Sequence, residues 1–154
     1  MSTDYVGIDP GKTGAIAIIE ESRRKVLDVP VINGDYYFYE MYMLLFKAKL
    51  SNVHTYLTLE RQQAMPGQGV SSTFQTGRGY GAWEAICSIT VPDFQIVSPR
   101  VWKKKLGLSK DKEASRALAI FLYPSMEEML SRKRDHNRAE ALLLAHYTKI
   151  MKEE

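Results

Sequence analysis

Three β-rich runs at the start of the chain constrain its fold more than any other feature. Residues 4–9 and 14–20 consist largely of small and β-branched apolar residues, and the segment PGKTG at 10–14 separates them. The glycines of this segment tolerate positive φ, so the two runs form a predicted hairpin. A third run at 25–31 continues it as an antiparallel meander, with Pro30 near its end, where a missing amide donor costs least. We therefore expect one side of a β-sheet here.

Helices and strands alternate after the meander. The predicted helices lie at 35–50, 71–90, 111–123 and 136–152, and the predicted strands lie at 55–60 and 94–97. Ser109 is a candidate N-cap for the third helix. Small residues on one face of the second helix predict close backbone packing: Gly77, Gly81, Ala82 and Ala85. The order β-β-β-α-β-α-β-α-α is typical of a mixed α/β fold.

Composition sets the domain count and the expected compartment. The chain has 154 residues, of which 45% are hydrophobic, enough for one continuous core, so we expect a single domain over residues 1–154. Cys87 is the only cysteine and cannot form an internal disulfide, which favours a reducing, intracellular setting. Residues 1–4 run directly into a predicted strand, and no apolar run approaches the roughly 20 residues that a membrane span needs. A soluble protein without a membrane anchor is expected.

Basic residues gather in two places, although the net charge is only +3. One group consists of Arg100, Lys103, Lys104, Lys105, Lys110 and Lys112, and the other of Arg132, Lys133, Arg134 and Arg138. Such clusters are typical of a face that meets phosphates. An ordinary solvated surface is the alternative interpretation.

Three acidic residues stand where a charge is costly. Asp9 ends the first predicted strand, Glu60 ends the fourth, and Glu140 lies in the apolar helix at 136–152. A lone buried carboxylate would be partly neutralised, whereas a shared divalent cation keeps several carboxylates ionised. Oxygen ligands without a Cys/His cluster favour Mg²⁺ or Mn²⁺. Taken singly, Asp9 could be a turn residue and Glu140 a solvent-facing one, but together the three favour a metal site.

Asp135 and His136 precede Glu140. His136 and Glu140 are four residues apart and share a helix face, whereas Asp135 would join them only from a bent or capping position. Asp135 is therefore either the N-cap of the last helix or a metal ligand. His136 is either a metal ligand, a group that orients water or offsets phosphate charge, or a plain surface histidine.

Three motifs occur in a fixed order: GIDPGKTG at 7–14, Leu59-Glu60, and DHNRAEAL at 135–142. Together with the glycine-rich segment after Glu60, SPRVWKK at 98–104 and KDKE at 110–113, they resemble the RuvC-like Holliday junction resolvases, including the phage and organellar branches. The resemblance implies a ribonuclease H-like fold with a five-stranded mixed sheet. It also implies a homodimer that nicks opposing strands of a four-way DNA junction symmetrically, in a bacterial or phage-infected cytoplasm or in an organelle.

The resemblance also implies roles for the acidic residues. Asp9, Glu60 and Glu140 match three family carboxylates that hold two Mg²⁺ ions, for which Mn²⁺ can substitute. Bacterial members often have a fourth acid three residues before the last, and here that residue is Asn137. Asp135 or His136 is expected to take its place.

The family segment that enters the junction matches residues 61–81. Here Met65 is a candidate wedge, Phe74 and Tyr80 are candidates for stacking near unpaired bases, and Phe74 and Trp83 are more typical of core residues. Trp102 is also expected in the core. The predicted DNA contacts are Lys12, Gln62, Gln63, Met65, Arg78, Arg100, Lys103, Lys104, Lys105, Lys110 and Lys112. Lys112 matches a family basic position beside the site.

Three other functions compete with this interpretation. A junction-binding protein that does not cut would have no use for acids near phosphate. An actin-like ATPase would share the loop at 9–14 but needs a duplicated domain and a second Asp-Gly loop. A ribonuclease H-like nuclease acting on RNA–DNA hybrids or on other branched DNA is excluded least well by the sequence.

Overall fold

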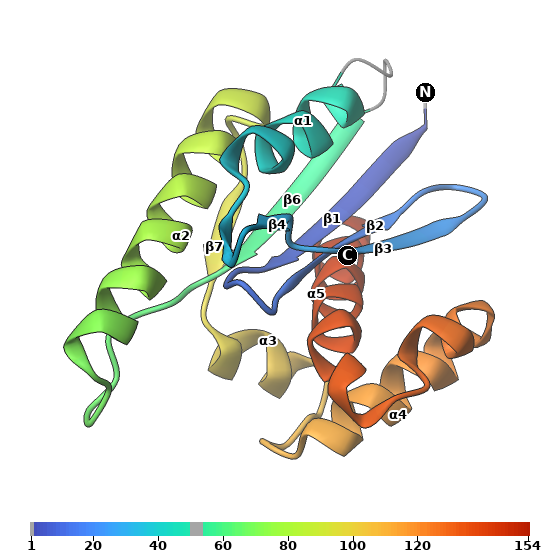
Figure 1. Ribbon diagram of the computed structural model, residues 1–154. Helices are drawn as coiled ribbons and strands as arrows, with labels where there is room; N and C mark the ends of the chain where they lie inside the picture. The colour runs from blue at the N-terminus through green and yellow to red at the C-terminus, as the bar shows by residue number, and fades with distance from the viewer. Residues whose placement is uncertain (1, 50–53) are drawn as a thin grey trace.

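The computed structural model describes residues 2–49 and 54–154 of the chain (Figure 1). Its strands are β1 (Thr3–Asp9), β2 (Ala15–Ile19), β3 (Arg24–Asp28), β4 (Val31–Ile32), β5 (Asp35–Tyr36), β6 (His54–Glu60) and β7 (Gln95–Val97). Its helices are α1 (Phe38–Lys49), α2 (Val70–Thr90), α3 (Pro99–Lys105), α4 (Lys112–Leu122) and α5 (His136–Glu153), with 3-10 segments η1 (Pro124–Leu130) and η2 (Lys133–Asp135).

Five strands form one mixed sheet in the order β3-β2-β1-β6-β7. β1 to β3 are antiparallel neighbours, whereas β6 lies parallel to both β1 and β7. The predicted five-stranded mixed sheet, with its first three strands antiparallel, is confirmed. Because β1 and β6 are parallel neighbours, their carboxyl ends meet at one edge of the sheet.

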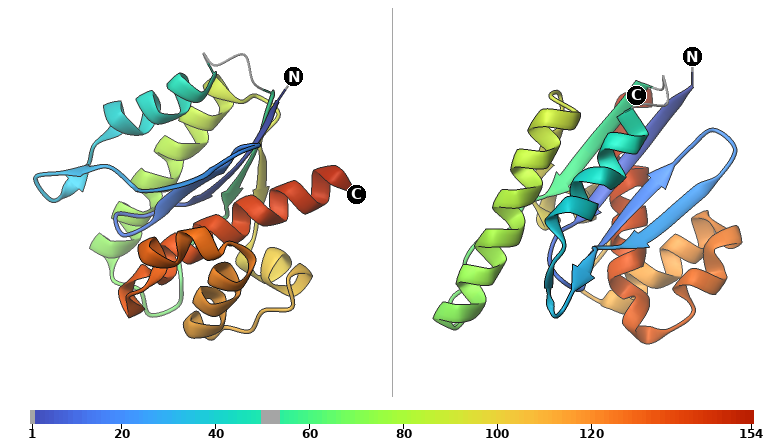
Figure 2. Two further views of the ribbon diagram at one scale, coloured as in Figure 1. Left: turned by 90° about the vertical axis from the view of Figure 1, so that its right-hand side faces the viewer. Right: turned by 45° about the horizontal axis from the view of Figure 1, so that its top comes forward.

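Helices cover both faces of the sheet (Figures 1 and 2). α1 and α2 lie on one face, over a core that includes Ile8, Leu59 and Trp83. α5 crosses the other face with α3 and α4 beyond it, over a core that includes Trp102 and Leu142. Trp83 and Trp102 are fully buried, as predicted. Within the described part of the chain, no helix has both the length and the apolar character needed to cross a membrane.

The segment between β3 and α1 differs from the prediction. The third strand ends at Asp28 instead of residue 31, and α1 begins at Phe38 instead of residue 35, while residue 50 lies outside the described residues. Between them, β4 and β5 pair as a small hairpin. Its turn is Asn33-Gly34, both with positive φ, a pair that favours two-residue hairpin turns.

The second half of the chain contains helical segments that were not predicted. α3 begins with Pro99 directly after Ser98, and η1 and η2 fill the space between α4 and α5. The predicted cap of α4 is wrong, because Asp111, not Ser109, accepts the bond from the backbone amide of Glu113, at 3.0 Å.

The face of α2 that packs closely is not the predicted one. Gly77, Gly81 and Ala85 are exposed, and the two glycines have open space where a side chain would stand. Gly79 makes the close contact instead, since a Cβ there would overlap the ring of Tyr36. Phe74 is 65% exposed, so its expected place in the core is wrong.

Gly7 in β1 lets α5 lie directly on the sheet. A Cβ at this position would overlap the backbone of Ala141, Leu144 and Ala145. Two of the α5 residues beside Gly7 are alanines, and one turn farther on Thr148 donates a bond of 2.9 Å to the carbonyl of Leu144. This contact fixes the depth of the helix on the sheet.

We expect Gly7→Ala to destabilise the fold by about 3 kcal/mol, because overpacking against backbone cannot be relieved by a rotamer change. Gly69→Ala is the control, since nothing lies within 4 Å of its Cβ position, and it should cost less than about 1 kcal/mol. Urea unfolding monitored by circular dichroism measures both. Equal stability of the two variants would contradict the close contact.

Candidate active site

Two buried carboxylates end neighbouring parallel strands. Asp9 is the last residue of β1 and Glu60 the last of β6, and the register pairs Ile8 with Leu59 directly before them. Both acids are only 8% exposed. The meeting of these two acids at one edge, expected from the sequence, is therefore what the structure shows.

A third carboxylate reaches this edge from α5. Glu140 precedes Ala141, whose backbone lies against Gly7, so the helix carries Glu140 towards the ends of the strands. The Nζ of Lys103 in α3 lies 2.7 Å from the Glu140 Oε1, and the two side chains are 19% and 12% exposed. A nearly buried ion pair therefore forms one wall of the site.

α3 also holds the second carboxylate. The indole Nε1 of Trp102 donates a hydrogen bond of 2.8 Å to the Glu60 Oε2. Trp102 is fully buried, so this bond is shielded from water and fixes the orientation of Glu60. Sequence reasoning assigned Trp102 to the core and Lys103 to phosphate contacts, and their bonds to the two acids were not foreseen.

The electrostatics show that the three acids share one environment. Burial raises the pKa of Asp9 well above its usual value, Glu60 and Glu140 raise it further, and Lys103 and Lys112 lower it. Burial raises the pKa of Glu60 from 4.5 to about 7, against the lowering effect of the Trp102 bond. Negative charge in this site is therefore destabilised unless a cation is added.

The donor set fits hard divalent cations. Asp9, Glu60 and Glu140 offer carboxylate oxygens, which Mg²⁺ and Mn²⁺ prefer. Among the described residues, no three Asp, Glu, His or Cys side chains already stand in a metal-ligating arrangement. In the structure, the ammonium of Lys103 occupies one side of the Glu140 carboxylate. The ligand assignment stays a prediction that the clustered acids support.

Asp135 is not brought to these carboxylates. Its Oδ2 accepts bonds from the Arg132 backbone amide at 2.9 Å and from the Arg132 Nε at 3.2 Å, and Arg138 lies 3.6 Å away. Hydrogen bonds from Arg132 outweigh burial and leave the pKa of Asp135 below its usual value. Asp135 is the N-cap residue of α5, as one of the two expectations had it, but its side chain makes no capping bond to that helix.

The beginning of α5 lies beside the β1–β2 turn. Asn137, at the position of the missing family acid, donates a bond of 2.8 Å from its Nδ2 to the Thr13 carbonyl. His136 is half-buried, with Nδ1 3.4 Å from the Lys133 carbonyl, and its charge acts on Glu113 at the start of α4. His136 is thus the first residue of α5 and lies close enough to the start of α4 for its charge to act on Glu113.

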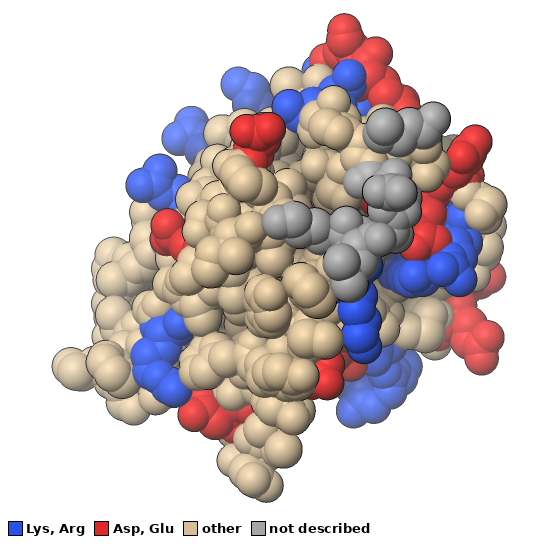
Figure 3. Space-filling view, turned by 90° about the horizontal axis from the view of Figure 1, so that it is seen from above, with Lys and Arg blue, Asp and Glu red and all other residues tan. Residues whose placement is uncertain are grey.

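The predicted basic contacts fall into two groups. Arg100 and Lys104 on α3, Lys110 before α4 and Lys112 at its start are exposed, and the charge of Lys112 acts on Asp9. Lys105 pairs with Glu154 at 2.9 Å, and in the second cluster Arg132 and Arg138 pair with acids. At the opposite end of the molecule, where β1 and β6 begin, acidic and basic side chains are interspersed (Figure 3).

The segment after Glu60 leads away from the site as an exposed loop. The Gln62 Nε2 donates a bond of 3.1 Å to the Pro10 carbonyl and so ties this loop to the β1–β2 turn. Gln63 is exposed, and Met65 is 59% exposed, as a wedge requires. Lys12 and Arg78 converge instead on Asp35, at 3.8 and 3.0 Å.

Comparison with solved structures defines the class of fold. RuvC from T. thermophilus in complex with Holliday junction substrate matches with a TM-score of 0.65 at 14% identity, over 98% of this chain and 95% of that chain. A second Thermus thermophilus RuvC structure matches with a TM-score of 0.54 at 16% identity, over 99% and 97%. The chain therefore has the ribonuclease H-like fold of RuvC.

Comparison of sequences adds a particular relative. The chain is 36% identical over 97 residues to the chloroplastic Holliday junction resolvase MOC1 of Chlamydomonas reinhardtii. The match covers 60% of this chain and 11% of that protein, so the chain spans about a tenth of its relative. No family profile matches the chain. The resemblance to Holliday junction resolvases seen in the motifs is confirmed.

The raised pKa of Glu60 predicts a pH dependence of stability without metal ions. Between its usual pKa of 4.5 and the folded value of about 7, the folded chain holds a proton at Glu60 that the unfolded chain has lost. Stability should therefore fall as the pH rises through this window, by at most about 1.4 kcal/mol per pH unit from this group. Denaturant unfolding in EDTA measures the slope. Glu60→Gln keeps an acceptor for Trp102 but does not titrate, so an unchanged slope in this variant would contradict the assignment.

Proposed function

We propose that this chain is a metal-dependent endonuclease that resolves four-way DNA junctions by paired symmetrical nicks. The observation that carries the proposal is the meeting of Asp9, Glu60 and Glu140 at one edge of a ribonuclease H-like sheet, each acid shifting the charge balance of its neighbours. The likeness to a protein named as a Holliday junction resolvase supports the choice of substrate. That relative is chloroplastic, and we propose an intracellular location here, cytoplasmic or organellar.

Asp9, Glu60 and Glu140 would hold two Mg²⁺ ions, with Mn²⁺ as a substitute. When bound, the ions supply a water activated at neutral pH and offset charge on the leaving oxygen. We assign the role of the fourth active-site group, beside the three carboxylates, to His136, because it shares a helix face with Glu140. Asp135 is instead paired with two arginines.

The protein's own side chains prepare this site for a phosphodiester. Trp102 holds Glu60 in one orientation, so its oxygens are preorganised. Lys103 and Lys112 place positive charge beside the acids and would attract the phosphate that the acids alone repel. The nearly complete burial of Asp9 and Glu60 limits access of bulk water.

The exposed basic side chains of α3 and α4 extend this positive charge outwards. Arg100, Lys104, Lys110 and Lys112 are proposed to contact the DNA backbone on both sides of the cut. Met65 and Gln63 are proposed to reach the junction centre from the loop after Glu60. Lys12, Arg78 and Lys105 would first have to leave their acidic partners.

Asp9→Asn and Glu60→Gln should abolish nicking, by more than about 1,000-fold, while junction binding stays within about threefold, because the amides keep the shape and lose the ligand charge. Cleavage of a labelled four-way junction in Mg²⁺ and gel-shift binding in Ca²⁺ measure the two properties. Undiminished nicking by both variants would remove these acids from the reaction.

The same cleavage assay separates His136 from Asp135 as the candidate for the fourth active-site group. His136→Asn should lower the cleavage rate at least tenfold and raise the Mg²⁺ concentration needed for half-maximal rate. Asp135→Asn should leave that Mg²⁺ requirement unchanged and lower only thermal stability, since it breaks the bonds with Arg132. The reverse pattern would return Asp135 to the site.

The strongest alternative is a ribonuclease H-like nuclease with other substrates. Three-way forks, flaps, plain duplex and RNA–DNA hybrid should therefore be offered beside the four-way junction in Mg²⁺. Preferential cutting of the junction supports the proposal, and exclusive cutting of the hybrid would replace it. Junction binding without any cleavage would indicate a non-cutting relative.

Paired nicks need two sites, and we propose that two copies of the chain meet through α2. This helix is 21 residues long, roughly 30 Å. Its outer face is exposed, with small residues that permit close approach flanked by apolar ones: Val70, Phe74, Gly77, Gly81, Ala85 and Ile89. Arg78 lies on the same face by helical spacing and is paired with Asp35. Because Asp35 offsets the charge of Arg78, this face can meet its own copy with little like-charge repulsion, as a two-fold interface requires.

Phe74→Glu should convert a dimer to a monomer, because it places two like charges in a desolvated contact. Phe121→Glu is the matched control, since Phe121 is 79% exposed on α4, away from this face. Sedimentation equilibrium measures the mass. A circular plasmid that carries a four-way junction shows whether the two cuts remain paired, because paired cuts linearise it and a single cut leaves a nicked circle. A dimer that survives Phe74→Glu would place the interface elsewhere.

A further inference from the structure

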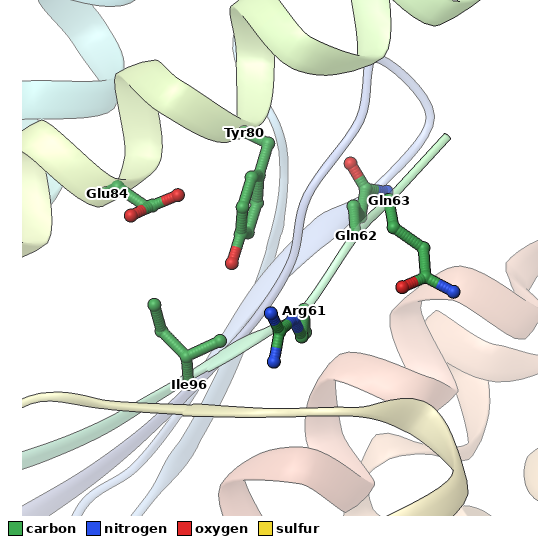
Figure 4. Close-up of a pocket in the computed structure, with 6 residues that line it drawn as sticks. All are labelled: Arg61, Gln62, Gln63, Tyr80, Glu84 and Ile96. Atoms are coloured by element: carbon green, nitrogen blue, oxygen red, sulfur yellow. The ribbon is translucent and has the colours of Figure 1, made fainter. Parts of the chain in front are cut away.

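A cleft of about 330 Å³ opens beside the candidate active site. Tyr80 and Glu84 reach into it from α2, while Arg61 and Ile96 face them from the sheet (Figure 4). Gln62 and Gln63 complete its lining. Its volume lies at the small end of the range for ligand pockets, about 300–1,000 Å³.

The cleft and the carboxylates lie on opposite faces of the same strand end. Side chains alternate along a strand, so Glu60 points towards α3 and α5, and Arg61 points towards α2. Their Cα atoms are only about 3.8 Å apart. When a DNA strand crosses this edge of the sheet with one phosphate at the acids, a neighbouring nucleotide of the same strand would lie over the cleft.

Two opposite charges face the cleft without neutralising each other. Among the described residues, no ion pair joins Arg61 to Glu84 or gives either of them another partner. Burial raises the pKa of Tyr80, Glu84 raises it further and Arg61 lowers it, so both charges act on one hydroxyl. The cleft thus offers a double donor and a double acceptor around one aromatic ring.

Gln62 adds a third polar group that lacks a partner. Its amide nitrogen is used by the Pro10 carbonyl, whereas its Oε1 is buried and makes no hydrogen bond in the structure. A buried acceptor without a donor is costly, and a ligand that supplies the donor would remove this cost.

We propose that this cleft binds a guanine of the DNA strand that is cut and so sets the sequence at which the chain cleaves. An unpaired guanine offers two neighbouring donors, N1–H and the N2 amino group, to the two oxygens of Glu84. It also offers two acceptors, O6 and N7, to the fork of Arg61. The other bases lack this double match. Tyr80 supplies a ring for stacking, which is sequence-tolerant by itself. This inference rests on the proposed function, because it requires that the chain cuts or binds DNA at the neighbouring acids.

Cut-site sequencing on four-way junctions with a randomised core tests the proposal. The wild-type chain should favour guanine at one fixed position by about 5- to 150-fold, the range for a bidentate contact. Arg61→Gln and Glu84→Gln should each lower this preference at least fivefold. Asp93→Asn, an exposed carboxylate outside the cleft, is the charge-matched control and should keep it.

Base analogues assign the contacts to atoms in an Asp9→Asn background, where binding is measured without cutting. Hypoxanthine lacks the N2 amino group. Replacing the guanine by hypoxanthine should weaken junction binding by the chain that retains Glu84, but not by the chain that also carries Glu84→Gln. Likewise, 7-deazaguanine lacks the N7 acceptor. It should weaken junction binding by the chain that retains Arg61, but not by the chain that also carries Arg61→Gln. A junction that is cut without a guanine preference, or a preference that survives both variants, overturns the proposal. Absence of both cutting and binding on every junction instead overturns the proposed function, and this inference with it.

Discussion

The close packing of α5 on β1 is the contact on which the site depends. Gly7 leaves no side chain between the strand and the helix backbone, so Ala141 and Ala145 lie directly on the sheet. Farther along, the hydroxyls of Thr148 and of Thr58 in β6 are hydrogen-bonded at 2.7 Å, which anchors the same helix to the neighbouring strand. With both strands fixed, Glu140 has one position relative to Asp9 and Glu60. A larger residue at position 7 would move the third carboxylate away from the other two.

This geometry brings three carboxylates together where water has little access, and side chains of α3 offset part of the free-energy cost of burying their negative charge. Trp102 donates to Glu60 and Lys103 pairs with Glu140, while Asp9 has only the more distant charges of Lys103 and Lys112 to lower its pKa. Hence Asp9 is the acid whose ionisation depends most on an added cation. On the proposed function, Lys103, which stabilises the free site, would also face the incoming phosphate, and binding of substrate would then be linked to release of Glu140.

Local pattern predicted the parts of the molecule that local forces determine. The meander, the acids at the strand ends and the two core tryptophans follow from alternation and from the cost of buried charge. Other features depend on tertiary contacts: α3 is short and basic, so its bonds to Glu60 and Glu140 exist only because the sheet and α5 bring the acids to it. Two misses did carry local signals. Asn33-Gly34 is a hairpin turn pair, and the spacing of Arg132 and Asp135 permits their ion pair.

The exposed position of Phe74 differs from the core position that the sequence favoured, and the three faces of α2 explain the difference. An aromatic residue in a helix is expected in the core, yet α2 has three faces with different uses. Trp83 faces the core and Gly79 packs on Tyr36 of β5, Tyr80 and Glu84 face the cleft, and Phe74 with the small residues faces outwards. On the proposed assignments, one rigid helix therefore joins the dimer contact to the base-reading cleft. Because Arg61 of that cleft directly follows Glu60, the pairing of two copies would set the spacing of both the reading sites and the cutting sites.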